Sequence, residues 1–295
     1  MILVTGGAGY VGRNVARVLK GPVAVVDDFR NSWRASLPPG ATLLEGDVAS
    51  VRPDWDKVEA VVHCAGSMDV AESVRDPALY WRNNVVAAAV FFRDAGAKRV
   101  VFSSTCQVYG EPEFLPVSED HPTRPINPYG RTKLAAEELF AGLGLRLTVL
   151  RYFNAAGGDQ IHRNETHLIP RLLRAALTGE TVPIFGDGHA IRDFVHVEDV
   201  ARAHVAALER PGVYNLGSGR GASVVEIVEV ARRVTGKEIP LRFEPPRPGD
   251  PKVLVADISR ARRDLGWEPR HDLRSIVAGT WEWLKAHPQG YSLPG

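Results

Sequence analysis

The sequence predicts an α/β protein with a doubly wound parallel sheet (a Rossmann fold) and a second, smaller lobe. Apolar runs of strand length alternate with helical patterns over the first 155 residues, which is typical of βαβ units. A glycine-rich turn joins the first apolar run to the first helical pattern. The periodicity changes after Gly158, and 295 residues are enough for a second lobe. We therefore expect residues 1–155, with 190–215, to form the sheet domain, and 156–189 with 216–295 to form the smaller lobe.

The composition is that of an ordinary globular protein and excludes several classes of partner. A formal net charge of +1 gives no reason to expect nucleic acid or an acidic membrane surface. The chain has no apolar run of membrane-spanning length and no basic leader, so we expect a cytoplasmic protein. Its two cysteines, Cys64 and Cys106, lack metal-binding spacing, which favours a reducing compartment and predicts no metal site.

The first strand, expected at residues 1–4, leads through the sequence Thr-Gly-Gly-Ala-Gly-Tyr-Val-Gly into a helix. Strand, glycine turn and helix form the context of a dinucleotide fingerprint, in which backbone amides approach the pyrophosphate. A second strand, at 23–26, ends in Asp27 and Asp28. A carboxylate there can bind the ribose hydroxyls and repel a 2′-phosphate. The pattern therefore favours NAD over NADP.

Two further strands are expected before residue 70. The strand at 41–44 is followed by Asp47, which either reaches the adenine edge or is an ordinary turn residue. The continuous apolar strand at 60–64 contains His63, which we interpret as a packed histidine because no partner spacing suggests a metal. The strand ends in Ala65 and Gly66, whose small size would let a cofactor lie close.

A long helix is expected from Asp76 to Phe92, and a buried strand at 99–102 follows it. The apolar positions of the helix are too many for one buried stripe, which allows a subunit contact as well. Thr105 comes just after the strand, where parallel sheets bind ligands. It either hydrogen-bonds a substrate hydroxyl or caps a turn.

The segment from Pro128 to Lys133 predicts the start of a helix that carries Tyr129 and Lys133 on one face. A neighbouring ammonium favours the charged form of a phenol, so Tyr129 is a candidate general base. A further strand, at 147–152, is followed by Asn154. Scattered arginines of the second lobe, Arg192 and Arg247, are suited to phosphate recognition, although most surface arginines have no such role.

These segments resemble a known family. Residues 5–12, 103–110, 128–133 and 151–154 are similar to motifs of the extended short-chain dehydrogenases/reductases. Within them the chain most resembles the UDP-glucose 4-epimerases (UDP-galactose 4-epimerases), also at 166–170, 192–197, 214–218 and 287–291. The resemblance covers nearly the whole chain. It implies epimerisation of a UDP-hexose at C4, with NAD as a tightly bound cofactor, and a homodimer formed through helices near 85–92 and 134–140.

The resemblance also assigns roles to individual residues. Tyr129 is the base, Lys133 lowers its pKa and holds the nicotinamide ribose, and Thr105 takes the family's Ser/Thr position. The NAD site is implied at Gly6, Gly9, Tyr10, Val11, Gly12, Asp27, Asp28, Phe29, Asn31, Ser32, Asp47, Val48, Cys64, Ala65, Gly66, Asn83, Tyr129, Lys133 and Phe153. The UDP-sugar site is implied at Thr105, Tyr129, Asn154, Leu168, Phe185, Arg192, Arg247 and Asp250.

Two departures from the family bear on the substrate. Many members have Lys where this chain has Met68. The position that limits C2 substituents is taken by Leu254, which is smaller than the Tyr of strict glucose/galactose enzymes. We therefore expect that UDP-GlcNAc (and with it UDP-GalNAc) also fits.

Other functions stay open on the sequence. A nucleotide-sugar 4,6-dehydratase would need an additional acid and base, and Cys106 and Gln107 stand where those enzymes have Asp and Glu. A reductase or decarboxylase of nucleotide sugars is a second alternative. A non-catalytic NAD-binding module is a third, which the retained Tyr129 and Lys133 disfavour.

Overall fold

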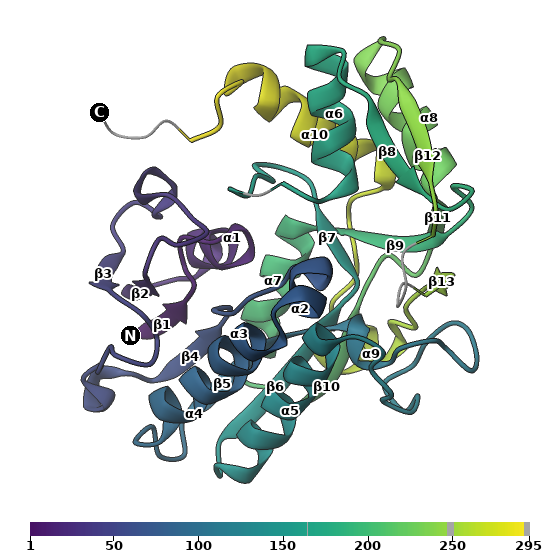
Figure 1. The fold of residues 1–295 in the computed structure, drawn as a ribbon. Helices are drawn as coiled ribbons and strands as arrows, with labels where there is room; N and C mark the ends of the chain where they lie inside the picture. Colours follow the sequence, from purple (N-terminus) through teal and green to yellow (C-terminus); the bar gives the residue numbers. More distant parts are fainter. Residues whose placement is uncertain (164, 247–250, 292–295) are drawn as a thin grey trace.

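The computed structural model describes residues 1–163, 165–246 and 251–291. It has two lobes, one around a large parallel sheet and one containing α6, α8 and α10 (Figure 1). Arg247 and Asp250, both expected at the substrate site, lie outside the described residues. Within the described part of the chain, no helix has the length and apolar character needed to cross a membrane.

The large sheet has seven strands in the order β10-β6-β5-β4-β1-β2-β3, and all neighbours are parallel. The strands are β1 (Ile2–Thr5), β2 (Val23–Asp27), β3 (Thr42–Glu45), β4 (Ala60–His63), β5 (Arg99–Thr105), β6 (Arg146–Tyr152) and β10 (Gly212–Leu216). The direction of strand progression reverses between β1 and β4. A crevice forms outside the carboxyl ends of the strands at such a point, and ligands bind there. The doubly wound α/β fold is thus confirmed.

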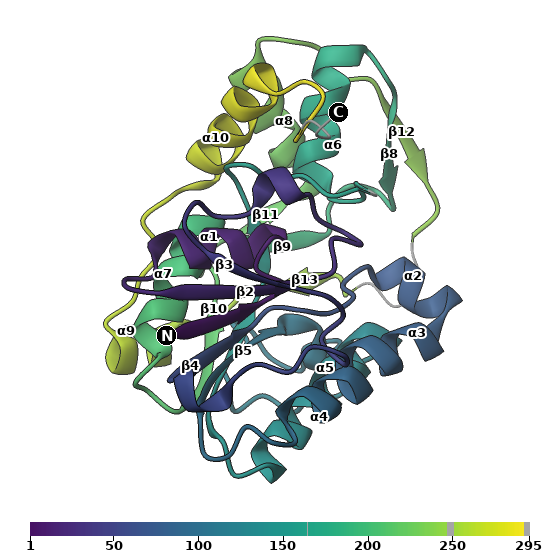
Figure 2. The same ribbon diagram turned by 90° about the vertical axis from the view of Figure 1, so that its left-hand side faces the viewer.

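Helices cover both faces of this sheet (Figures 1 and 2). One face carries α1 (Tyr10–Val18) and α7 (Val197–Ala207), and the other carries α4 (Ala87–Phe92) and α5 (Pro128–Gly142). Successive strand residues point to opposite faces. Val4 accordingly belongs to the core under α1 and α7, whereas Leu3 belongs to the core under α4 and α5.

The expected helix from Asp76 is interrupted. It consists of α3 (Pro77–Trp81), a π-helical turn (Arg82–Val86) and α4, with α2 (Val70–Arg75) just before it. The π turn contains Asn83, which lines the crevice, and the buried Asn84; π turns are often found at functional sites. Short 3₁₀ turns occur at Arg34–Ser36, Trp55–Lys57 and Cys106–Val108.

The second lobe is built on two small sheets. In one sheet β9 (Ile191–His196) pairs with β7 (Asn154–Ala156), β11 (Gly221–Ser223) and β13 (Val253–Leu254). In the other, β8 (Val182–Phe185) pairs with β12 (Leu241–Glu244). The lobe has its own apolar core under α6 (Leu168–Thr178), α8 (Val224–Thr235) and α10 (Leu273–Ala286).

One helix from the carboxyl-terminal third returns to the large sheet. Helix α9 (Ser259–Leu265) contacts β10 and α7, and the buried Trp267 belongs to the core of the large lobe. The expected division of the chain into lobes stays a prediction, and α9 shows that their residues interleave along the sequence.

Candidate active site

A cavity of about 860 Å³ lies at the carboxyl ends of the large sheet. The turn between β1 and α1 and the ends of β2, β4 and β5 contribute residues to its wall, and so do Leu168, Phe185 and Arg192 of the second lobe. Both lobes therefore contribute to one site, as expected for a sheet that presents its ligands to a smaller lobe.

The glycine turn can adopt its shape only because side chains are missing. Gly6 has a φ of +65°, in the left-handed region that favours glycine. A Cβ on Gly12 would lie 2.1 Å from the carbonyl oxygen of Gly6. Helix α1 begins after Gly9 without a side-chain cap, so its first amides are available to an anion. The turn therefore fits the pyrophosphate of a dinucleotide.

Replacing Gly12 with Ala is expected to abolish retention of a dinucleotide while the protein still folds. The added methyl group would displace the Gly6 carbonyl and widen the turn. The affinity for NAD should therefore fall at least ~10-fold, which corresponds to about 1.4 kcal/mol of binding free energy lost to overpacking. NAD released on denaturation of the purified protein measures this. Gly142→Ala is the matched control, because that exposed glycine at the end of α5 has no positive φ and a Cβ on it meets nothing within 4 Å. Equal NAD content in both variants would contradict the prediction.

Asp27 has a structural role as well as a place in the cavity wall. Its carboxylate accepts hydrogen bonds from the amides of Ala8 and Phe29, both at 2.9 Å, and from Ser32 Oγ at 2.7 Å. It thereby holds the glycine turn against the loop after β2. Asp28 is the more accessible carboxylate of the pair.

Sequence reasoning missed Arg30, which lies between two of the predicted acidic residues. It contacts Asp28 at 3.0 Å and Asp47 at 3.3 Å. An arginine near the ribose can accept a 2′-phosphate. Here the Arg30 guanidinium is already paired with the carboxylates of Asp28 and Asp47. The end of β2 therefore keeps the acidic character that favours NAD over NADP.

The start of α5 brings Tyr129 to the end of β5. Asn127 caps the helix by accepting the Gly130 amide at 2.8 Å, and Pro128 occupies the first turn. A Cβ on Gly130 would lie 2.5 Å from the carbonyl oxygen of Gln107, so glycine permits the close approach. Tyr129 thereby lies near Thr105, and both residues line the same cavity.

The ionisation of Tyr129 and Lys133 differs from the expectation. Burial raises the pKa of Tyr129 to about 12, and Thr105 is the side chain whose hydrogen bond lowers it. The lowering of this pKa by Lys133 is therefore not seen. Burial lowers the pKa of Lys133 itself to about 8. Its ammonium lies over the Phe102 ring, 4.3 Å from the centroid. Both groups are thus held in the protein interior, where electrostatic interactions with a ligand are strong.

Most of the expected site residues line this single cavity. They are Gly6, Gly9, Tyr10, Val11, Gly12, Asp27, Asp28, Asn31, Ser32, Asp47, Val48, Cys64, Ala65, Gly66, Asn83, Thr105, Tyr129, Lys133, Phe153, Asn154, Leu168, Phe185 and Arg192. Their roles in binding or catalysis stay predictions.

Phe29 and Leu254 are placed elsewhere. Phe29 has a φ of 56° and packs its ring against Arg34, with 4.8 Å between the guanidinium and the ring centroid. Leu254 is fully buried in the core and is not part of the cavity wall. The structure therefore gives no support to the argument that Leu254 sets the room for a C2 substituent.

Several residues of the cavity wall were not among the site residues predicted from the sequence. Gln107 and Tyr152 lie at or just after the ends of β5 and β6, and their place in the cavity wall can be predicted only once the register of these strands is known. His162 and His167 lie in the loop between β7 and α6, and only the path of that loop brings them to the cavity.

Comparisons with known proteins agree with this geometry. Residues 2–217 match the model of the NAD dependent epimerase/dehydratase family. The chain belongs to this family. It is 44% identical to a UDP-glucose 4-epimerase of Corynebacterium glutamicum, covering 97% of this chain and 96% of the relative. It is 40% identical to a UDP-glucose 4-epimerase of Lactobacillus helveticus, covering 98% of each.

A solved structure extends the agreement to three dimensions. A UDP-glucose-4-epimerase from Stenotrophomonas maltophila, with bound NAD and formylated UDP-arabinopyranose, is 35% identical and superposes with a TM-score of 0.91 over 98% of both chains. The family match includes the glycine turn, Thr105 and the Tyr129–Lys133 pair. The two relatives align with nearly the whole chain, so the similarity also includes the second lobe, which contributes residues to the cavity.

Proposed function

We propose that this protein interconverts UDP-glucose and UDP-galactose by NAD-dependent epimerisation at C4 of the hexose. The observation that carries the proposal is the placement of Tyr129 against Thr105 in the same cavity as the glycine turn. Relatives about 40% identical over nearly the whole chain are UDP-glucose 4-epimerases, which supports the same substrate here.

Tyr129 handles the proton of the reaction. Its phenolic oxygen accepts the proton of the sugar 4-hydroxyl and later returns it, while Thr105 orients the phenol. NAD, when bound, supplies reversible hydride acceptance at the sugar carbon. Lys133, buried in the wall of the same cavity, would provide a cation to hold the ribose of the cofactor.

Residues of the second lobe hold the nucleotide and leave the sugar mobile. Arg192 provides a cation for the diphosphate, and Leu168 and Phe185 provide apolar wall for the base. Asn154 is oriented by donating to the Asp193 carbonyl at 3.1 Å. Anchoring at the nucleotide is required because epimerisation must present both faces of the sugar carbon to the cofactor.

The purified protein is expected to convert UDP-glucose to UDP-galactose without added NAD, because a cofactor that ends each turnover unchanged can stay bound. Turnover should be on the order of 10 per second, typical of metabolic enzymes. Chromatographic separation of the two UDP-sugars measures the product. A 4-keto-6-deoxy product would instead indicate a dehydratase, and no conversion of any nucleotide sugar would favour a non-catalytic NAD-binding module.

The same assay measures whether the protein accepts other UDP-sugars. The expected acceptance of UDP-GlcNAc stays a prediction, and conversion to UDP-GalNAc at a rate comparable with UDP-glucose tests it. UDP-xylose and UDP-glucuronic acid serve as probes for the decarboxylase alternative.

We further propose a cytoplasmic homodimer. Trp81 and Val86 are 44% and 54% exposed on one stretch of helix and offer an apolar contact surface. Phe91 and Phe92, in contrast, are buried in the chain's own core and are not available to a partner. The two free cysteines support a reducing compartment. Analytical ultracentrifugation of Trp81→Glu against the parent protein tests the interface.

A further inference from the structure

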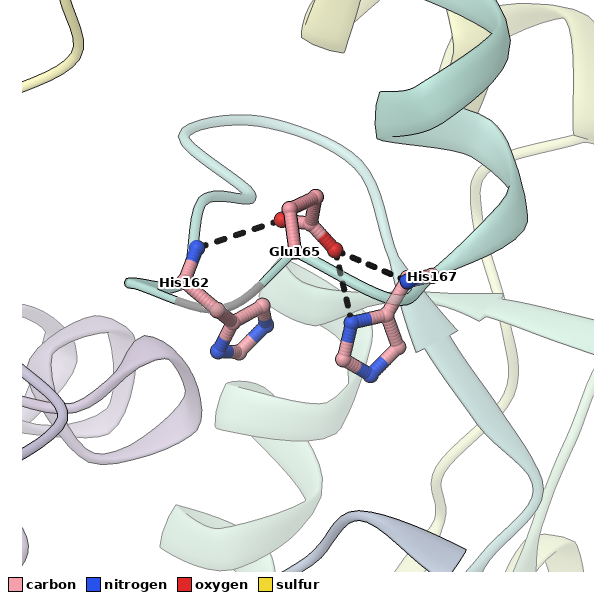
Figure 3. A group of neighbouring side chains, drawn as sticks. All are labelled: His162, Glu165 and His167. Atoms are coloured by element: carbon pink, nitrogen blue, oxygen red, sulfur yellow. Dashed lines mark hydrogen bonds and ion pairs between the residues drawn. The ribbon is translucent and has the colours of Figure 1, made fainter. Parts of the chain in front are cut away.

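The loop between β7 and α6 brings together two histidines and a glutamate that are unremarkable in the sequence. Figure 3 shows the side chains of His162, Glu165 and His167 grouped at one point of this loop, with one potential ligand atom from each within 4.8 Å of the others. The two imidazole rings lie 4.5 Å apart between centroids and 32° from parallel.

Glu165 connects the two histidines. One carboxylate oxygen, Oε1, lies 2.9 Å from Nδ1 of His167 and accepts the His167 amide at 2.9 Å. The other, Oε2, accepts the amide of His162 at 3.1 Å. The carboxylate is only 10% exposed, so its charge faces the cluster and not bulk water. A carboxylate held against imidazole in this way fixes the ring orientation, as it does around metal ions.

His162 carries the second, independent observation. It is 9% exposed, and its Nε2 atom has no hydrogen-bond partner among the described residues. Buried polar atoms of this kind are normally hydrogen-bonded, so this nitrogen is available to a ligand. A neutral imidazole with a free lone pair is the form that binds metal ions.

We propose that His162, Glu165 and His167 form a divalent cation site whose preferred ion is Zn²⁺. Two imidazoles and one carboxylate are a donor set that suits zinc, with bonds of about 2.0–2.2 Å and the fourth position left open. Ligand atoms around such an ion are roughly 3.3 Å apart by tetrahedral geometry. The 2.9 Å separation of His167 Nδ1 and Glu165 Oε1 is close to this, so the ion takes the place of the shared proton.

The position of the site determines what the ion can reach. His162 and His167 line the large cavity, and Leu168 follows directly. The proposed site therefore borders the part of the cavity assigned above to the nucleotide. The assignment of the ion itself does not depend on that proposed function, because it rests on the three side chains alone.

A second histidine cluster in the structure is less suited. His196, Glu198 and His271 also bring ligand atoms within 4.8 Å. However, Nδ1 of His196 accepts the Glu198 amide as a helix cap, and the Glu198 carboxylate is 62% exposed. This cluster provides the matched control.

The test is a zinc titration of the full chain after dialysis against a chelator. Isothermal titration calorimetry is expected to give one Zn²⁺ per chain. Glu165→Gln and His162→Phe should each weaken binding at least ~10-fold. Glu198→Gln, in the second cluster, and His189→Ala, at an exposed loop histidine, should bind like the parent protein.

Cobalt substitution distinguishes this site from the cysteines. Co²⁺ in the parent protein should show visible d–d bands without a thiolate charge-transfer band. The bands should be lost in His162→Phe, whose ring retains the packing against Tyr10. A thiolate band, unchanged binding in both site variants, loss of binding in Glu198→Gln, or no binding of zinc to the parent protein would each overturn the proposal. Circular dichroism confirms that the variants are folded.

Discussion

Replacement of Tyr129 by Phe is expected to lower kcat for UDP-glucose epimerisation by ~10²–10⁴-fold, the usual contribution of a positioned general acid–base group. The ring stays, so its edge-to-face contact with Tyr80, 6.3 Å between centroids, is kept. Only the phenolic oxygen near Thr105 is removed. KM and NAD content should therefore change little, and steady-state kinetics with a measurement of bound NAD separates these effects.

Tyr80 supplies a matched control. Its hydroxyl donates to the Asp69 carbonyl at 2.6 Å and lies 2.9 Å from a Glu72 carboxylate oxygen, away from the reaction. Tyr80→Phe should cost about 0.5–1.5 kcal/mol of stability per lost hydrogen bond and change kcat only a few-fold. If Tyr129→Phe kept more than a tenth of the parent kcat, Tyr129 would not be the base.

The course of the large sheet could be predicted because its signals are local. Each strand is a short apolar run, and the glycine turn follows directly from residues 6–12. Tyr129 and Lys133 lie four residues apart on one helix, so their proximity follows from helical geometry. The strands and the helical pair can both be predicted from residues that are close together in the sequence.

What could not be predicted depends on contacts between distant segments. The raised pKa of Tyr129 arises from burial, which the i, i+4 spacing does not reveal. Asp27 was expected to face a ribose, yet three of its hydrogen bonds go to its own loop and the glycine turn. The grouping of His162 with His167 requires the path of the β7–α6 loop. In each case the sequence supplies the residue type, and the fold decides its partners.

Replacement of Arg13 by Met is expected to destabilise the protein by about 3–5 kcal/mol, because it removes the buried cation that is paired with a buried carboxylate. Arg13 lies on α1, and its Nε is 2.8 Å from Oδ2 of Asp159, with the two side chains 1% and 6% exposed. Tyr291, near the end of the described chain, donates to the same carboxylate at 2.6 Å. The pair thus joins three segments that are far apart in the sequence. Thermal unfolding measures the loss.

The pH dependence of the loss identifies its cause. Burial alone would raise the pKa of Asp159, but the charge of Arg13 and hydrogen bonds from Arg13, Tyr291 and Asn14 hold it well below its usual value. A carboxyl with a depressed pKa stabilises the fold above its unfolded pKa of about 4, and this contribution is lost as the pH falls. Without Arg13 the pKa of Asp159 should rise toward its unfolded value, so the stability difference between parent and variant should be full above pH 4 and should narrow as the pH falls below about 4.

Arg17→Met serves as a control that distinguishes the loss of the buried ion pair from the loss of one positive charge. It contacts the same carboxylate oxygen at 2.8 Å, but its side chain is 40% exposed. Water screens its charge, and Arg17→Met should therefore cost no more than about 1 kcal/mol. Equal losses of unfolding free energy in Arg13→Met and Arg17→Met would mean that the net charge determines the stability and the burial of the ion pair does not. A stability difference that stayed constant as the pH fell below about 4 would show that the Arg13 side chain stabilises the protein by packing against Tyr10 and Tyr291 instead.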